Sequence, residues 1–318
     1  MEKQRLKQCC RFSVFVLLAV FVFMSKQSFG GGNEFKSPGI VSIHAVGAFM
    51  GNAFPTNPML EDITELKIAP GIFSYSINGR RSDSCGNTSC NKLIQSEDGY
   101  GIALSLVHAF TPNIGIGISG AYVKSDGSIG ATGFSTIGLT DSRKYSGPVK
   151  ETGSLAAAVV ILDPFSDPDG FRMPFTLGLS YQNISVDWDV PFIFTDRSLS
   201  TTTQVGDSGR DTGNFRLSSP GWYAGFSLQF NTWLFRWSPF AVSSDAFTRP
   251  EHTWTVKNLT TGTSVERHQT SSQTGSSSFG MPVTFRPLGL TFSYIYNWVD
   301  DPNRPKLNTY ILSWSKKW

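Results

Sequence analysis

The stretch that decides the fold is GYGIALSLVHAFTPNIGIGISGAYVK, which runs from Gly99 to Lys124. Apolar residues occupy every second position on both sides of the short Thr-Pro-Asn break at 111–113. Successive side chains of a strand point to opposite faces, so each arm has one apolar face and one face that is almost bare. Because Thr, Pro and Asn are turn residues, the stretch predicts an antiparallel hairpin.

The same two-residue period returns along the rest of the chain. It is clear at 171–182, 222–231, 279–286, 290–298 and 310–318, and weaker at 66–77, 153–162 and 235–247. Together these segments predict about ten antiparallel strands, within a range of about eight to twelve. A soluble β-sandwich would show a similar alternation and is the alternative fold.

Two features favour a membrane barrel over a sandwich. Several apolar faces end in Tyr or Trp, as the aromatic girdles of a membrane barrel do: Tyr100, Tyr122, Tyr181, Trp222 and Trp298. Short connections such as 111–113 alternate with long ones at 79–98, 125–152, 187–220 and 248–275, although the last connection, 300–305, is short. Since an open sheet edge is costly in hydrocarbon, the first and last strands must pair. We therefore predict an all-β fold, a closed antiparallel transmembrane β-barrel.

The N-terminus has the layout of a secretory signal peptide. Four basic residues precede an apolar run at 12–24, and the small residues Ser28 and Gly30 follow it. A membrane anchor is the alternative, but a spanning helix needs about 20 apolar residues. We expect a signal peptide at 1–30, a periplasmic or plug segment at 31–62 and the barrel at 63–318, located in a bacterial outer membrane. Cleavage would turn the formal charge from +3 to about −1, so the basic balance indicates no nucleic-acid partner.

Cleavage would leave Cys85 and Cys90 as the two cysteines of the mature chain. In an oxidising compartment such a pair predicts a small disulfide loop, here within the first long connection. A metal site is the alternative, but two thiols without nearby His or further Cys favour it less.

The C-terminal residues Tyr310, Leu312, Trp314 and Trp318 share one face of the last predicted strand. They resemble the aromatic-ended strand by which barrels of this class are recognised by the barrel-assembly machinery. Lys316 on the same face departs from that pattern, because an apolar residue is usual there.

Small residues, among them Gly47 and Gly51, are followed by the pair Asn57 and Pro58 before the first predicted strand. This segment resembles the N-terminal hatch of the FadL/TodX-type outer-membrane transporters of fatty acids and aromatic hydrocarbons. The resemblance implies that the segment plugs the barrel and that hydrophobic ligands leave sideways through a gap in the wall. The chain departs from the family in being too short for its usual barrel.

The predicted lumen faces of 99–105 and 115–119 are nearly free of side chains, and Gly in a strand often marks the close approach of another backbone. A narrow barrel must fill its interior, either with the plug or with large side chains from the opposite wall. The candidates for that second filling are Arg172, Gln182, Tyr223, Gln229 and Arg286.

Catalytic and metal-binding motifs are missing from the sequence: it has no Gly-x-Ser-x-Gly elbow and no metal-type His cluster, and we expect no cofactor. The leading expectation is passive passage or uptake of a small solute that could be hydrophobic, with outer-membrane lipid, the assembly machinery and that solute as partners. The alternative is a surface-exposed binding or structural barrel that acts through its long loops. An outer-membrane hydrolase is a third and less favoured class.

Overall fold

The structure is a computed structural model that describes residues 40–51, 59–80, 92–136, 139–165, 171–194, 206–249, 251–270, 275–297 and 306–318. Cys85, Cys90, Asn57, Pro58 and Trp298 lie outside these ranges, as does the expected signal peptide. Within the described residues, no helix combines the length and the apolar character needed to cross a membrane.

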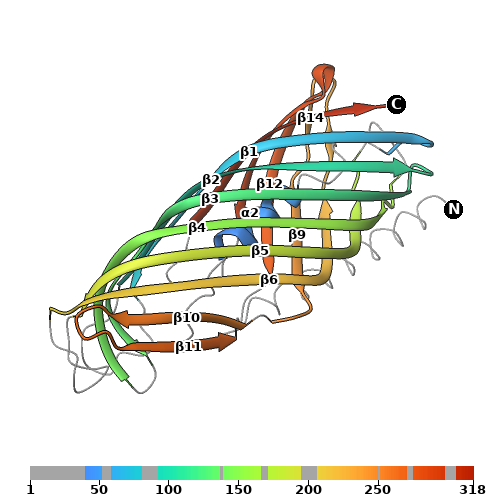
Figure 1. Cartoon of the computed structure of the whole chain (residues 1–318). Coiled ribbons are helices and arrows are strands. Elements are labelled where there is room, and N and C mark those ends of the chain that lie inside the picture. Colours follow the sequence, from blue (N-terminus) through green and yellow to red (C-terminus); the bar gives the residue numbers. More distant parts are fainter. Residues whose placement is uncertain are drawn as a thin grey trace.

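Ten antiparallel strands form a closed ring, as the alternation predicts (Figure 1). The ring consists of β1 (Ile63–Arg80), β2 (Lys92–Ala109), β3 (Ile114–Thr136), β4 (Leu139–Leu162), β5 (Phe175–Phe194), β6 (Ser208–Ser227), β9 (Phe240–Ala246), β12 (Ser276–Phe285), β13 (Leu290–Asn297) and β14 (Lys306–Lys317). The first and last strands pair, with Gly71 opposite Ile311, so the sheet has no open edge there. The closed barrel is therefore confirmed.

The remaining segments continue ring strands and add none to the ring. They are β7 (Phe230–Asn231), β8 (Phe235–Trp237), β10 (Glu251–Asn258), β11 (Ser264–Thr270) and the 3₁₀ turn η1 (Arg286–Leu288). The segments β8, β9 and β10 pair with β7 and β6 in a single register. The paired residues are Trp237 with Phe230, Phe240 with Ser227, Ala246 with Gly221 and Thr253 with Asn214. These three segments are thus one bent strand, and β10 and β11 form a hairpin beyond the ring (Figure 1).

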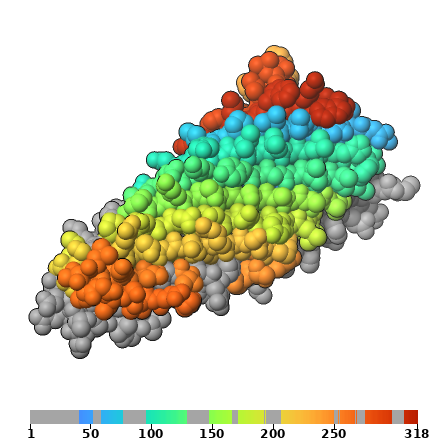
Figure 2. All heavy atoms as spheres, in the orientation of Figure 1, coloured from blue at the N-terminus to red at the C-terminus, as the bar shows by residue number. Residues whose placement is uncertain are grey.

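The predicted alternation between outward and lumen faces is confirmed. On β2, Ile102, Leu104 and Leu106 are 42%, 49% and 38% exposed, while Ala103 and Ser105 between them are buried. Figure 2 shows the continuous outer wall that β1 to β6 present. This orientation leaves an apolar exterior that water would not solvate well.

The long connections at 125–152 and 187–220 are not the surface loops that we expected. The strands β3 and β4 extend to Thr136 and from Leu139, and β5 and β6 extend to Phe194 and from Ser208. A strand that leaves the apolar zone no longer faces lipid, so its outer face need not be apolar and its sequence loses the two-residue period. The wall therefore continues as paired strands where the sequence pattern fades.

Candidate functional site in the plugged lumen

A single helix, α2 (Ile40–Gly51), lies inside the ring of strands (Figure 1). Its sequence IVSIHAVGAFMG is apolar on nearly every side, and the side chains of residues 41–51 are all buried. A helix without a polar face requires apolar surroundings on all sides. It contacts β1, β2, β3, β4, β9, β12, β13 and β14. The helix is thus a plug in the lumen.

The wall and the helix fit each other through glycines on both partners. A Cβ atom on Gly101 of β2 would lie 2.9 Å from Phe49 Cζ, and one on Gly153 of β4 would lie 3.0 Å from Val46 Cγ1. The bare wall positions thus face large side chains of the helix, which is the close approach that lumen glycines indicate.

On the opposite side the helix supplies the glycines. Side chains added at Gly47 and Gly51 would collide with Ser276 of β12 and Phe240 of β9, respectively. Both glycines were plug candidates in the sequence, and both face the wall at close range.

Polar contacts with the wall help to hold the helix. Ser42 N donates to Glu151 Oε2 (2.8 Å), Tyr223 Oη donates to Met50 O (3.1 Å), and His44 Nδ1 lies 3.4 Å from Ser276 Oγ. The Glu151 carboxylate at the first turn also interacts favourably with the positive end of the helix dipole. The contacts lie near both ends of the helix, so together they fix its position along the lumen.

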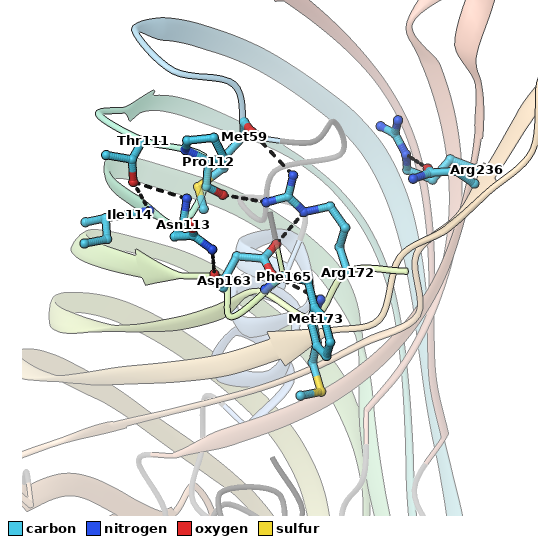
Figure 3. Close-up of polar contacts among 11 residues, drawn as sticks. Met59, Thr111, Pro112, Asn113, Ile114, Asp163, Phe165, Arg172, Met173 and Arg236 are labelled. Carbon is cyan, nitrogen blue, oxygen red and sulfur yellow. Dashed lines mark hydrogen bonds and ion pairs between the residues drawn. The ribbon is translucent and has the colours of Figure 1, made fainter. Parts of the chain in front are cut away.

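A buried arginine closes the short-turn end (Figure 3). The Arg172 guanidinium, fully buried, donates from Nε to Asp163 Oδ2 (2.7 Å), from Nη2 to Pro112 O (2.6 Å) and from Nη1 to Met59 O (3.4 Å). Met59 belongs to the connection between α2 and β1, whereas Pro112 and Asp163 belong to two turns of the wall. The arginine therefore ties the plug's connection to the wall, and we call this cluster the Arg172 hub.

Asp163 completes the hub by bonding with both oxygens. Its Oδ1 accepts from Phe165 N (3.0 Å) and from Met173 N (3.5 Å), and its backbone carbonyl accepts from Asn113 Nδ2 (2.6 Å). Burial raises the pKa of this carboxyl, while the hydrogen bond from Phe165 and the charge of Arg172 act in the opposite direction. Removal of Arg172 would leave this desolvated carboxyl without its counter-charge.

The other expected lumen residues lie at different depths. Gln182 and Tyr223 are buried in the lumen, and Gln229 pairs through its backbone with Arg172 (2.8 and 3.1 Å). Arg286 lies at the rim of the lumen, because the 3₁₀ turn η1 ends the alternation of β12 there. The Nη1 of Arg286 donates to Thr232 O (2.6 Å).

The C-terminal aromatic face points outward on β14. Tyr310, Leu312, Trp314 and Trp318 are 44%, 55%, 41% and 58% exposed. Their role in barrel assembly stays a prediction.

The sequence reasoning missed a set of charges in the lumen near the short-turn end. Glu65 and Lys67 of β1, Arg236 of β8 and Lys317 of β14 are mostly buried there, and Arg236 Nε donates to Asn231 Oδ1. The signal was present, because Glu65 and Lys67 alternate with Leu66 and Ile68, which places the charges on the face opposite to lipid.

No family model matches the sequence, and no curated protein matches it. Among solved structures, the chain is similar to the toluene transporter TbuX of Ralstonia pickettii, with 11% identity and a TM-score of 0.42 over 90% of this chain and 99% of that one. It is also similar to the CymD monoaromatic hydrocarbon channel, with 11% identity and a TM-score of 0.41 over 92% of this chain and 96% of that one. The similarity to the outer membrane protein OprG from Pseudomonas aeruginosa has 9% identity and a TM-score of 0.33 over 81% of this chain and 98% of that one. Similarities this low transfer no function to this chain.

Proposed function

We propose that this chain is a bacterial outer-membrane barrel that lets a small apolar solute pass when the plug helix α2 moves. The observation that carries the proposal is the helix itself, which is lodged in a closed barrel and packs against the wall through apolar side chains and glycines. A plug of this kind closes a lumen that would otherwise be open, and packing without covalent attachment allows it to shift.

The outer surface supports a location in a membrane. A rise of about 3.4 Å per residue and a tilt of about 40° put Tyr100 and Phe110 of β2 about 26 Å apart along the membrane normal. The apolar band of such barrels is about 25 Å tall. Aromatic rings gather around the short-turn rim, where Phe171 contacts Phe165 and Phe230 at centroid distances of 5.4 and 5.2 Å. This rim matches the girdle expected at one membrane interface.

The lumen around α2 supports an apolar solute. Phe73, Phe215, Phe240, Ile295 and Ile311 are buried in the same cluster as the helix residue Phe49. If the helix moves, these side chains line the space that it leaves, and an apolar lining favours an apolar ligand.

One seam in the wall supports the sideways exit that the FadL-type resemblance implies. β6 pairs with β10 up to Asn214 and with β9 from Gly221 onward. Between these two ladders, the side chains of Phe215 and Leu217 are buried on the lumen side of β6. An apolar solute would meet here the point at which β6 changes its pairing partner.

A reversible lock tests the proposal. In a Cys85→Ser/Cys90→Ser background, Val46→Cys with Gly153→Cys would join the plug to β4, because these side chains face each other. In liposomes, oxidation should abolish the entry of a small aromatic hydrocarbon, and reduction should restore it. Hydrocarbon entry that oxidation does not change, or no hydrocarbon entry through the reduced, folded barrel, would contradict the proposed function.

The β10–β11 hairpin favours a second candidate, a binding barrel whose outer extension contacts a partner. The hairpin stands beyond the ring and adds to the edge of β6. Replacement of 251–270 by a short loop should leave hydrocarbon entry unchanged and abolish surface binding if this second function holds.

A further inference from the structure

The outer wall carries an apolar groove of about 680 Å³ over β2 to β5. Its floor consists of Gly120 on β3 and of Ala156 and Ala158 on β4, whose side chains point away from the lumen. A Cβ atom on Gly120 would have only Leu155 O nearby, at 3.9 Å, so the space above the floor is open. The groove is thus a feature of the lipid-facing surface and is separate from the plugged lumen.

Larger apolar side chains form the two walls of the groove. Leu104 and Ile118 stand on one side and are 49% and 60% exposed, whereas Leu179 and Tyr181 stand on the other and are 68% and 51% exposed. The ladder beneath is continuous, with Gly120 opposite Ala156 and Ala156 opposite Tyr181. Because the backbone pairing beneath it is continuous, the groove is a shallow trough on the surface and not an opening through the wall.

Polar and basic groups continue the trough toward the long-connection end. Along the same face of β4, Ser154 and Thr152 follow Ala156, and Lys124 of β3 lies directly opposite Thr152. The cross-strand row that holds Lys124 also contains Arg216 of β6, whose guanidinium pairs with Asp187 of β5 (2.8 Å), so Lys124 supplies the cation of this row. The trough therefore changes from apolar to hydroxylated and cationic over about 13 Å between Gly120 and Lys124.

We propose that this trough binds one acyl chain of a phosphate-bearing lipid of the outer leaflet, with the lipid phosphate at Lys124 and the hydroxyls of Thr152 and Ser154. An apolar trough in hydrocarbon loses contacts unless a chain fills it, because each unfilled position lacks partner atoms. An ammonium group and hydroxyl donors then form charge-assisted and ordinary hydrogen bonds to phosphate oxygens. The next row along the wall, with Asp98, Asp126 and Lys150, is less suited to an anion. The inference rests on the membrane location proposed above.

Lipid retention by the purified full-length barrel tests the inference. The probe is lipid A, titrated into detergent-solubilised protein and counted by native mass spectrometry. Gly120→Leu fills the floor without a clash and should reduce binding about tenfold. Lys124→Gln removes the cation and should reduce binding about threefold to tenfold.

Matched controls separate the trough from the general surface. Val160→Leu enlarges an exposed position on the same face of β4 outside the groove, and Lys257→Gln removes an exposed cation on β10. Both controls should bind lipid A as the wild type does. Each variant must first show the heat-modifiable migration of a folded barrel.

Three results would overturn the inference. They are equal binding by Gly120→Leu and the wild type, equal binding of dephosphorylated lipid A, and equal displacement by diacylglycerol, which has acyl chains and no phosphate. A barrel that binds lipid A as expected but admits no hydrocarbon would contradict the proposed function alone. A chain that fails to insert into lipid would contradict both.

Discussion

The two halves of the barrel wall accommodate the plug in opposite ways. β1 to β6 are strands of 18 to 24 residues, and their glycines Gly101 and Gly153 make room for Phe49 and Val46 of the helix. β9, β12 and β13 have only 7, 10 and 8 residues, and there the wall supplies side chains while the helix supplies glycines. The difference shows that the fit is reciprocal, so a change in size on either partner should move the helix.

The Arg172 hub joins turns of the β1–β6 half, and its loss should have the largest effect. Arg172→Met keeps the apolar stem but leaves the buried Asp163 carboxyl without its charge partner. We expect a loss of about 3–5 kcal/mol in the free energy of unfolding, measured by urea titration in detergent. Arg172→Met with Asp163→Leu should recover part of it, whereas equal stability of Arg172→Met and the wild type would refute the role of the hub.

A charge on the lipid face should be the next most costly change. Leu104 in the regular half and Phe292 in the short-stranded half are 49% and 54% exposed. Each changed to Arg should cost about 2–4 kcal/mol, because the guanidinium must enter hydrocarbon. Ser128→Arg, on an outward position of the β3 extension, is the control and should cost little. If Leu104→Arg is tolerated while Phe292→Arg destabilises the barrel, only the short-stranded half faces lipid.

Two glycines of β3 and β2 compare the lumen with the exterior. Gly101→Leu drives a side chain into Phe49 and should destabilise the barrel by about 1–3 kcal/mol or displace the helix. Gly120→Ala points into open space on the outside and should leave stability and conductance unchanged. The two variants are distinguished by the temperature at which their migration on detergent gels changes and by their conductance in bilayers. A Gly101→Leu variant that behaves as the wild type would show that the helix does not pack there.

The hydroxyl of Tyr223 isolates one of the contacts that hold the helix. Tyr223→Phe removes the hydrogen bond to Met50 O and leaves that carbonyl buried, so we expect a loss of about 1 kcal/mol. Hydrogen exchange of the α2 amides should speed up while that of β2 does not. Uniform acceleration across the barrel would instead indicate a global loss of stability.

The smallest effect is expected outside the membrane zone. Arg210 Nε donates to Asp189 Oδ1, and this bond lowers the pKa of the exposed Asp189 carboxyl. A carboxyl whose pKa is lowered in the folded state stabilises the protein at pH values above the ordinary carboxyl pKa. This stabilisation is lost as the pH falls through the lowered pKa of the folded state. Because both groups are exposed, Asp189→Asn should not shift the unfolding midpoint at neutral pH beyond error.

The sequence was sufficient for the outer surface and for the strand number, because lipid on one face imposes a strict two-residue period, as Ile102, Leu104 and Leu106 show. It also indicated that the bare faces at Gly99 and Gly101 leave lumen space to be filled, and it left open whether a plug or large side chains of the opposite wall fill it. The helical form of α2 was not predicted, although a twelve-residue, mostly apolar run without alternation is typical of a buried helix.

The Arg172 hub and the strand extensions could not be read from the sequence for physical reasons. Met59 and Arg172 are 113 positions apart, so no spacing rule connects them before the barrel closes. The extensions of β3 and β4 continue beyond the apolar zone, so the apolar alternation that lipid imposes on the outer face fades there. The 3₁₀ turn at Arg286, which interrupts the parity of β12, was not predicted either.

Ion conductance in planar bilayers tests the central claim, that α2 closes the lumen, most directly. The wild type should conduct in rare, brief openings, whereas the chain without residues 40–51 should form a steadily open pore of the same strand number. Gly101→Leu, which keeps the full chain, should fall between the two if the deletion does not assemble. Equal steady conductance by the wild type and the plug variants would contradict the claim.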